Sequence, residues 1–415
     1  MTRPDERPAE RLAELVRDEG RRVLATLVRT VGDLGVAEDA VSEATLTALR
    51  RWPVDGVPDQ PRAWLTTVAR NAALDILRRE ARRHAKEVAA VDLAALTARD
   101  LDEQPQDLLR LVFTCCHPAL SSETQVALAL RTLCGLATPD VARLLLLPEA
   151  TVAKRLTRAR RKIADAHIPY RVPPDEELPA RLAAVATTVH LLFTAGHAGG
   201  DALVRPELCD RAIALARQLV ALLPDESSLQ GLLALLLLTD ARRGTRLDGD
   251  GRLLLLSEQD RSRWDGDAIA EGAALVGSAL RRSRLAAGRF ELQAAIAACH
   301  ATAASYAETD WDDVVLLYDA LLGVEDTPVV RLNRAVAVGE RDGAAAGLAE
   351  LEALTGLEAW HLWHACRGAL LDRVGERDRA VAAYERALAC RPSPEEAAFL
   401  RERLVRPPAA DAPRG

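Results

Sequence analysis

The apolar residues of this chain recur at the spacing of α-helices along most of its length. Leu65, Val68, Ala69 and Ala72 stand at positions i, i+3, i+4 and i+7, which places them on one face of a helix. No stretch of the sequence shows the alternation of apolar and polar residues that is typical of a half-buried β-strand. The pattern therefore predicts an all-α protein.

Clusters of proline and glycine mark the predicted breaks between helices. They fall at Trp52–Pro61, Pro169–Pro174 and Thr327–Pro328. Residues 91–107 include five acids and little apolar pattern, and we interpret them as part of an acidic linker. The 415 residues are enough for two or three domains. We predict a helical domain over 1–88, the linker over 89–107, a second helical domain over 108–168, a helical extension over 169–325, helical repeats over 326–405, and a tail over 406–415.

Charge is divided unevenly along the chain. The net charge is -7 for the whole chain, but +2 over residues 1–170 and −9 over the remainder. Two stretches are strongly basic: residues 78–86, and TVAKRLTRARRKIA over 151–164, which has six basic residues and no acid. Two basic patches in an acidic chain indicate two contacts with a polyanion.

The second basic stretch lies in a helix-turn-helix pattern. Thr138 and Pro139 open a short amphipathic helix, Leu146–Pro148 form a turn, and Glu149 begins a longer basic helix. In this motif the first residues of the second helix face base edges in the major groove. The candidates are Glu149, Ala150, Thr151, Lys154 and Arg155 for base or nearby contacts, and Arg158, Arg160, Arg161 and Lys162 for phosphates. The alternative is a solvated amphipathic helix, but such helices usually pair basic residues with acids four positions away, so we favour nucleic-acid binding.

Two stretches resemble the extracytoplasmic-function (group four) sigma factors of the sigma-70 family. Their region four is similar to the stretch GLATPDVARLLLLPEATVAKRLTRARRKI. Their region two is similar to AEDAVSEATLTALRRW followed by PRAWLTTVARNAALDILRREARR. Both occur in the family's order within residues 10–165. The resemblance implies a sigma factor that directs promoter-specific transcription initiation, with core RNA polymerase and promoter DNA as its partners.

The resemblance also implies roles for individual residues. Asp39 and Glu43 would face the clamp of core RNA polymerase. The promoter minus-ten element would lie against Asn71, Asp75, Arg78 and Arg79, with the Trp52–Pro61 loop near its flipped base. The helix from Glu149 would read the minus-thirty-five element, and the acidic linker would thread through the RNA exit channel. Trp64 stands at an apolar helix position, where we expect a core role.

The chain after residue 168 contains a repeat. The pattern VGERDGAAAGLAELEAL from Val338 returns 36 residues later as VGERDRAVAAYERAL from Val374. Around the later copy, five residues fall at the offsets of a tetratricopeptide repeat: Gly368, Ala380, Tyr384, Ala387 and Pro392. Over its whole length the chain resembles the sigma-factor subgroup with a long tetratricopeptide-like C-terminal extension. We expect this extension to tune activity and to offer a site for a regulatory protein or ligand.

One short motif in the extension needs its own interpretation. Asp248, Gly249, Asp250, Gly251 and Arg252 resemble a signature of the same subgroup's extension. The stretch opens like a calcium loop, but it lacks the third acid and is followed by four leucines. We interpret it as a glycine-rich turn whose Arg252 pairs with an acid.

No chemistry is expected beyond binding. Cys115, Cys116 and His117 lack the ligand spacing of a zinc site, so we expect buried thiols, no metal and no cofactor. The sequence has no P-loop, nucleophile elbow or zincin motif, which argues against an enzyme. The first residues have no apolar signal core, and the longest apolar run, Leu232–Leu238, is too short to span a membrane. We therefore expect a cytoplasmic protein without membrane contact.

Two other functions stay open on the sequence alone. An operator-binding helix-turn-helix regulator with a helical-repeat sensor domain would explain the second basic patch, but it has no use for region two. A repeat scaffold would need neither basic patch. The region-two stretch therefore favours the sigma factor over both alternatives.

Overall fold

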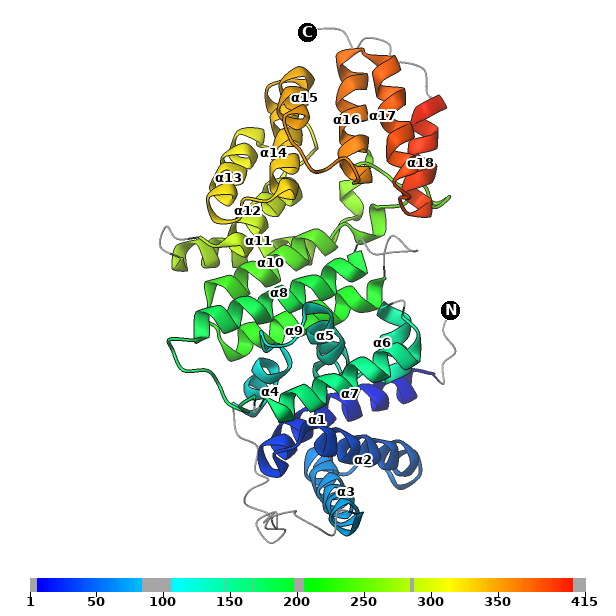
Figure 1. Cartoon of the computed structure of the whole chain (residues 1–415), viewed down its shortest axis with the longest axis vertical. Helices are drawn as coiled ribbons and strands as arrows, with labels where there is room; N and C mark the ends of the chain where they lie inside the picture. The colour runs from blue at the N-terminus through cyan, green and yellow to red at the C-terminus, as the bar shows by residue number, and fades with distance from the viewer. Residues whose placement is uncertain are drawn as a thin grey trace. The chain divides into compact units, whose positions relative to one another are not determined.

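A computed structural model describes residues 6–83, 106–145, 147–166, 168–197, 205–283 and 287–405. Within these ranges the secondary structure is helical apart from one isolated β-bridge between Leu247 and Leu253. The prediction of an all-α protein is confirmed. The chain forms two compact units, residues 1–191 and 192–415 (Figure 1).

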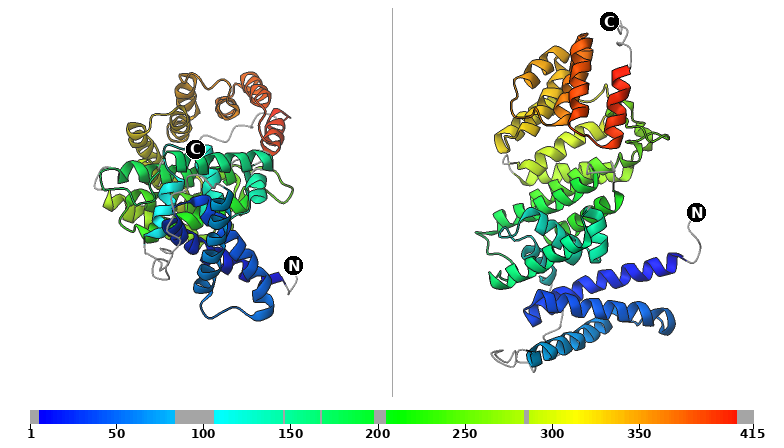
Figure 2. Two further views of the ribbon diagram at one scale, coloured as in Figure 1. Left: turned by 60° about the horizontal axis from the view of Figure 1, so that its bottom comes forward. Right: turned by 45° about the vertical axis from the view of Figure 1, so that its right-hand side comes forward.

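The first unit begins with three helices that pack on one another: α1 (Glu6–Val31), α2 (Leu34–Asp55) and α3 (Pro61–Arg83) (Figure 2). The Asp33 side chain caps α2 by accepting a hydrogen bond of 2.9 Å from the Val36 amide. At the other end, Gly56 has a φ of 86° and donates its amide to the Trp52 carbonyl. The predicted loop Trp52–Pro61 is therefore shorter than expected, because its first four residues complete α2. The Trp52 ring is buried and meets the Trp64 ring edge to face, with centroids 5.4 Å apart.

Four further helices follow in the same unit: α4 (Asp107–Cys115), α5 (Ser122–Leu128), α6 (Thr138–Leu145) and α7 (Glu149–Asp165), with a π-helical turn, η2 (Ala129–Leu133), after α5. The predicted linker lies outside the described residues over 89–105. Asp107, which we expected to be in that linker, is instead buried at the start of α4. A carboxylate that is folded into the protein cannot belong to a flexible tether.

Helix α8 (Leu178–His197) packs its first half onto this group of helices. The Arg181 guanidinium donates to the Phe113 carbonyl at 2.6 Å, and the Thr188 hydroxyl donates to the Gln125 side chain at 2.9 Å. Among the described residues, α8 is the one helix long and apolar enough to cross a membrane. Since both of these hydrogen bonds are buried inside the protein, we interpret α8 as a core helix.

In the second unit, each helix packs against the next one along the chain. The succession consists of α9 (Pro206–Leu222), α10 (Ser227–Asp240), α11 (Gly266–Arg282), α12 (Arg289–Thr302), α13 (Trp311–Val324), α14 (Pro328–Arg341), α15 (Ala344–Glu352), α16 (His361–Val374), α17 (Arg377–Ala389) and α18 (Pro394–Val405). Short 3₁₀ turns lie between α10 and α11: η3 (Arg243–Thr245), η4 (Leu256–Glu258) and η5 (Arg261–Arg263).

Glycines allow the last helix pairs to approach closely. A Cβ atom on Gly368 of α16 would lie 2.5 Å from the Tyr384 ring of α17. A Cβ atom on Gly347 of α15 would lie 2.6 Å from the Gly339 Cα of α14. Tyr384 itself is buried and donates its hydroxyl to Asp372 at 2.9 Å. Gly368 and Tyr384 therefore face each other across a helix pair, which is the packing that the repeat offsets predict.

Candidate functional site

The basic helix α7 begins at Glu149, as predicted, and has two distinct faces. Its buried residues are Val152, Leu156, Ala159 and Ile163, a spacing that leaves the opposite face to solvent. The candidates Glu149, Ala150, Thr151, Lys154 and Arg158 are exposed there, and Arg155 is half-buried. Helix α6, which begins at Thr138, and α7 form a helix-turn-helix in which α7 is the second helix.

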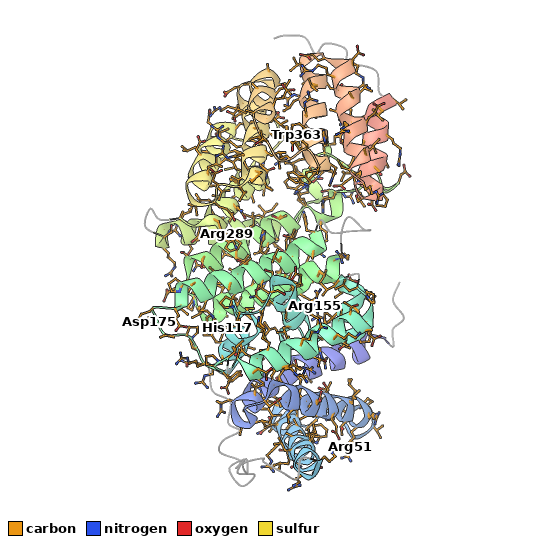
Figure 3. All side chains as sticks on the ribbon, viewed as in Figure 1. Arg51, His117, Arg155, Asp175, Arg289 and Trp363 are labelled. Atoms are coloured by element: carbon orange, nitrogen blue, oxygen red, sulfur yellow. The ribbon has the colours of Figure 1, made fainter. Side chains whose placement is uncertain are left out.

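A shallow groove of about 390 Å³ runs along α7 next to the start of α5. Four basic side chains line it: Lys154, Arg155, Arg158 and Lys162. The other lining residues are Leu120, Ser121, Thr124, Thr151 and Ala159. Figure 3 labels Arg155 at this surface. A groove that combines basic groups with hydroxyls suits phosphate oxygens and base edges.

The outward face of α2 is acidic and apolar. Asp39 and Glu43 are exposed one turn apart, and Leu46, three residues further along, is 54% exposed. Asp39, Glu43 and Leu46 therefore share one solvent-exposed helix face. We did not predict Leu46 from the sequence, although its place in register with Asp39 and Glu43 is a signal that could have identified it.

The outward face of α3 brings together the four residues predicted for the minus-ten element. Asn71, Asp75, Arg78 and Arg79 are all exposed. Arg78 forms an ion pair of 3.2 Å with Asp75, and the Arg79 Nε donates to the Asp75 carbonyl at 3.1 Å. Both guanidinium groups keep further donors for a ligand.

Comparison with known protein families matches both helical parts of the first unit. Residues 15–83 match Sigma-70 region 2, and residues 110–163 match Sigma-70 region 4. The ECF RNA polymerase sigma factor SigL of Mycobacterium tuberculosis is 33% identical over 138 residues, which cover 33% of this chain and 77% of SigL. This chain belongs to the ECF sigma-factor family.

Other relatives extend the comparison. The probable ECF RNA polymerase sigma factor SigI of Mycobacterium tuberculosis is 30% identical over 152 residues, which are 35% of this chain and 52% of SigI. An uncharacterized protein of Rhizobium meliloti (strain 1021) is 40% identical over 393 residues, 92% of each chain. Residues 181–280 match a family of unknown function, DUF6596. The likeness to the Rhizobium protein therefore includes the C-terminal extension that follows the two sigma regions.

Region 2 and region 4 of this sigma factor are joined by a buried ion pair. Glu38 of α2 is 3% exposed and accepts a hydrogen bond of 2.7 Å from the Arg160 Nε of α7. The Thr132 hydroxyl donates to the same carboxylate. Arg160, which we predicted to lie near DNA phosphates, has its guanidinium held by Glu38 in this structure.

A second buried carboxylate joins the same two regions. Asp107 of α4 is paired with Arg29 of α1 and with Arg110, each at 3.0 Å. The Tyr170 hydroxyl lies between the two regions as well, 2.6 Å from the Ala25 carbonyl and 3.0 Å from the Asp107 carbonyl. Burial, and then the Asp107 charge, raise the pKa of Tyr170 well above its usual value, so the phenol stays protonated and can donate.

Two adjacent thiols of region 4 lie in its buried core. Cys115 and Cys116 are fully buried. Burial raises the pKa of the Cys116 thiol to about 12, against smaller opposing effects of Thr188 and Arg181. The neighbouring His117 side chain accepts from the Ala119 amide at 3.1 Å. These residues support the core of region 4.

The predicted turn in the extension is a tight hairpin built around Asp248. The Asp248 carboxylate accepts from the amides of Asp250 and Arg252 at 3.0 and 2.8 Å, and Gly251 has a φ of 79°, which a glycine adopts without strain. Arg252 forms ion pairs of 3.1 Å with Asp248 and with Glu402 of α18. The expected pairing of Arg252 with an acid is thus present twice, and the second pair ties the hairpin to the last described helix.

Proposed function

We propose that this sigma factor binds core RNA polymerase through α2, reads promoter DNA through α3 and α7, and is tuned by its C-terminal extension. The observation that carries the proposal is that region 2 and region 4 expose the residues predicted for each partner. The predicted polymerase residues share one exposed face of α2, and the predicted promoter residues are exposed on α3 and, apart from the half-buried Arg155, on α7. An operator-binding regulator would need the second surface but not the first.

The α2 face supports a protein partner more than a nucleic acid. Asp39 and Glu43 would repel phosphates, whereas an exposed Leu46 gains by being buried against another protein. The acids would then set orientation and association rate against a basic partner surface. Core RNA polymerase is the partner that the family implies.

The α7 groove supports DNA. Lys154 and Arg155 lie in the first two turns of the second helix of the motif, which is the part that reaches base edges. Arg158 and Arg161 lie further along, where contacts to phosphates would fix the orientation without reading sequence. Only the first group is therefore expected to affect promoter choice.

Two observations support a tuning role for the extension. Its first helix, α8, contributes Arg181 and Thr188 to the core of region 4, so a change in α8 reaches the DNA-reading part directly. Further along the chain, the Asp248 to Arg252 hairpin is joined to α18 by Arg252 and Glu402. A folded extension of this kind favours support of activity over a loose acidic decoy.

Transcription in vitro with purified core RNA polymerase tests the proposal. We expect the full chain to give promoter-dependent transcripts with core enzyme, and to bind promoter DNA much more weakly without it. Tight, sequence-specific DNA binding without core enzyme, and no transcripts with it, would instead establish the operator-binding regulator. The tuning role is tested separately by a chain that ends at His197 and so keeps α8. Unchanged transcription by this shorter chain would reject tuning by the residues that follow α8, while leaving the sigma-factor function in place.

A further inference from the structure

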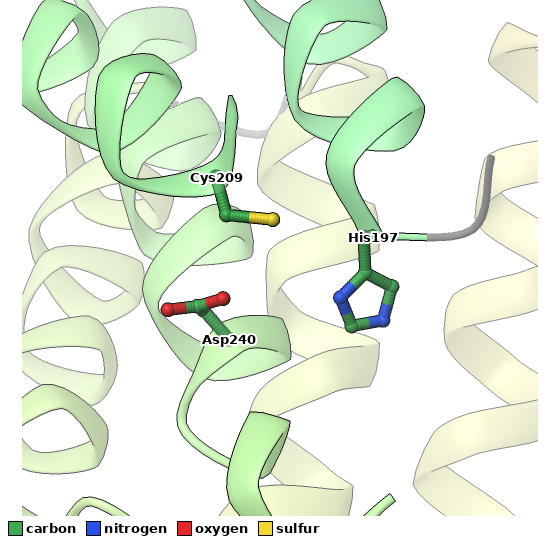
Figure 4. Close-up of side chains that lie close together, drawn as sticks. All are labelled: His197, Cys209 and Asp240. Atoms are coloured by element: carbon green, nitrogen blue, oxygen red, sulfur yellow. The ribbon is translucent and has the colours of Figure 1, made fainter. Parts of the chain in front are cut away.

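Three potential metal ligands meet in the extension, and none of them belongs to the surfaces described above. His197 is the last residue of α8, Cys209 lies in the first turns of α9, and Asp240 is the last residue of α10. Each side chain offers one ligand atom: an imidazole nitrogen of His197, the sulfur of Cys209 and a carboxylate oxygen of Asp240. These three atoms lie within 4.8 Å of one another (Figure 4). Among the described residues, these three side chains form the one cluster of histidine, cysteine and acidic groups that is close enough to hold a metal ion.

The three side chains are close without satisfying one another. His197 is 9% exposed, and its Nδ1 is buried without a hydrogen-bond partner among the described residues. The Cys209 sulfur is buried and makes only a long hydrogen bond of 4.0 Å to the Phe193 carbonyl within the described part of the chain. A buried imidazole nitrogen without a partner is costly. An ion between the three groups would give that nitrogen a partner.

The geometry suits a shared ion. Zinc lies about 2.0–2.3 Å from nitrogen, sulfur and oxygen ligands, so two of its tetrahedral ligands are about 3.3–3.8 Å apart. Donor atoms within 4.8 Å of one another need only small inward movements to reach this separation. The His197 ring stacks on the Phe193 ring, with the ring centroids 5.3 Å apart and the planes 15° from parallel, and this stacking fixes the orientation of the imidazole.

The surrounding charges restrict which ion the site can take. Arg243 donates to both carboxylate oxygens of Asp240, at 2.8 and 2.5 Å, so a metal ion would have to share one of these oxygens with it. Arg243 also donates to Asp210 at 2.7 Å, and Arg246 donates to the His197 carbonyl. These guanidinium groups oppose a bare cation, so both a thiolate and a carboxylate are needed to balance a divalent one. Sulfur and imidazole ligands favour zinc-like transition metals over magnesium or calcium.

We propose that His197, Cys209 and Asp240 bind a divalent transition metal ion of the zinc class, with a water molecule as the fourth ligand. The ion would fix the ends of α8 and α10 and the start of α9 to one another. This site lies within residues 181–280, the segment that matches DUF6596, and it is independent of whether the extension tunes transcription. The thiolate makes the site dependent on a reduced Cys209.

Cobalt(II) titration of the metal-free full chain tests the site. We expect one equivalent to bind with a sulfur-to-cobalt charge-transfer band and tetrahedral visible bands, and zinc to displace it. Cys209→Ser should abolish the charge-transfer band, and His197→Gln should weaken binding by more than about tenfold. Asp240→Asn should weaken binding but keep the band, because the thiolate remains. Cys390→Ser, at a partly exposed thiol that follows the last residue of α17, is the matched control and should bind as the unchanged protein does.

A second measurement does not depend on the variants folding. Zinc should slow alkylation of Cys209 in the unchanged protein, measured by peptide mass spectrometry, more than that of Cys299 or Cys390. The proposal is overturned by absence of cobalt binding, by a charge-transfer band that survives in the folded Cys209→Ser protein, or by alkylation of Cys209 that zinc leaves unchanged.

Discussion

Glu38 and Arg160 are 122 residues apart in the chain and form an ion pair whose carboxylate is buried between region 2 and region 4. Removing one partner of a buried pair leaves the other charge without compensation. We therefore expect Glu38→Gln to lower the free energy of unfolding by about 3 kcal/mol, measured by urea denaturation. Replacing both partners by leucine should recover most of the stability.

The neighbouring acid provides the control for this prediction. Asp39→Asn changes the same charge on the same helix, but Asp39 is exposed, so its effect should stay within about 0.5 kcal/mol. Equal destabilisation by Glu38→Gln and Asp39→Asn would show that the ion pair does not stabilise the packing of the two regions.

Charge reversal on the α2 face should weaken the complex with core RNA polymerase. We expect Asp39→Lys with Glu43→Lys to reduce affinity by about tenfold or more, since like charges across an interface cost several kcal/mol, while the helical content stays unchanged. The matched control is Asp175→Lys with Glu176→Lys, which makes the same change of charge at two exposed loop residues. If both double reversals reduce core binding equally, α2 is not the polymerase surface.

Substitutions along α7 should separate sequence reading from phosphate binding. In holoenzyme, Lys154→Ala and Arg155→Ala should change the ranking of promoters that differ in the minus-thirty-five element. Arg158→Ala and Arg161→Ala should weaken binding to all promoters alike. Each should also make the slope of the logarithm of the binding constant against the logarithm of salt concentration shallower by about 0.9 for each phosphate that is no longer neutralised. The measurement is promoter affinity at several salt concentrations. An equal reduction on every promoter from all four substitutions would leave only a general polyanion surface.

The Arg252 to Glu402 pair gives a point test of the extension. Arg252→Ala removes the link between the hairpin and α18, so we expect it to lower promoter-dependent transcription. The decrease should be modest, roughly twofold to fivefold, because the ion pair is exposed to solvent. The control is Arg282→Ala, which removes the Arg282–Asp225 pair of the same unit from a similarly exposed arginine. A rise in transcription with Arg252→Ala would favour a masking role for the extension.

The close approach of Gly368 to Tyr384 predicts a size limit in the repeat. Gly368→Ala puts a methyl group 2.5 Å from the ring, and such overpacking typically costs about 1–3 kcal/mol. Gly323→Ala is the control: it adds a methyl group near the end of α13, where nothing lies within 4 Å, and should be neutral or stabilising by up to about 1 kcal/mol. Thermal unfolding of both variants measures the difference, and equal melting temperatures would contradict the close packing.

Local signals in the sequence predicted local structure well. The apolar spacing and the Thr138 and Glu149 starts were enough to predict the helix-turn-helix, and the repeat offsets included Gly368 and Tyr384, which face each other in the structure. These features depend on neighbours a few residues away or on the next helix. The proline-rich stretch after Trp52 misled the prediction, because Pro53 is accommodated in the last turn of α2.

Contacts between distant parts of the chain could not be predicted in this way. Glu38 and Asp39 are adjacent acids in one motif, and only the folded chain shows that the first is buried against Arg160 while the second is exposed. Asp107 looked like the end of an acidic linker for the same reason. The spacing of His197, Cys209 and Asp240 matches no metal-binding pattern, since each comes from a different helix.

The Tyr170 hydroxyl, held between the Ala25 and Asp107 carbonyls, sets an order of events during protein synthesis. Ala25 leaves the ribosome 145 residues before Tyr170, which at about 5–20 residues per second is a delay of roughly 7–30 s. During that time, the face of region 2 that will bind region 4 has neither Arg160 nor Tyr170 to cover it. These contacts between region 2 and region 4 can therefore form only after region 2 itself has been made.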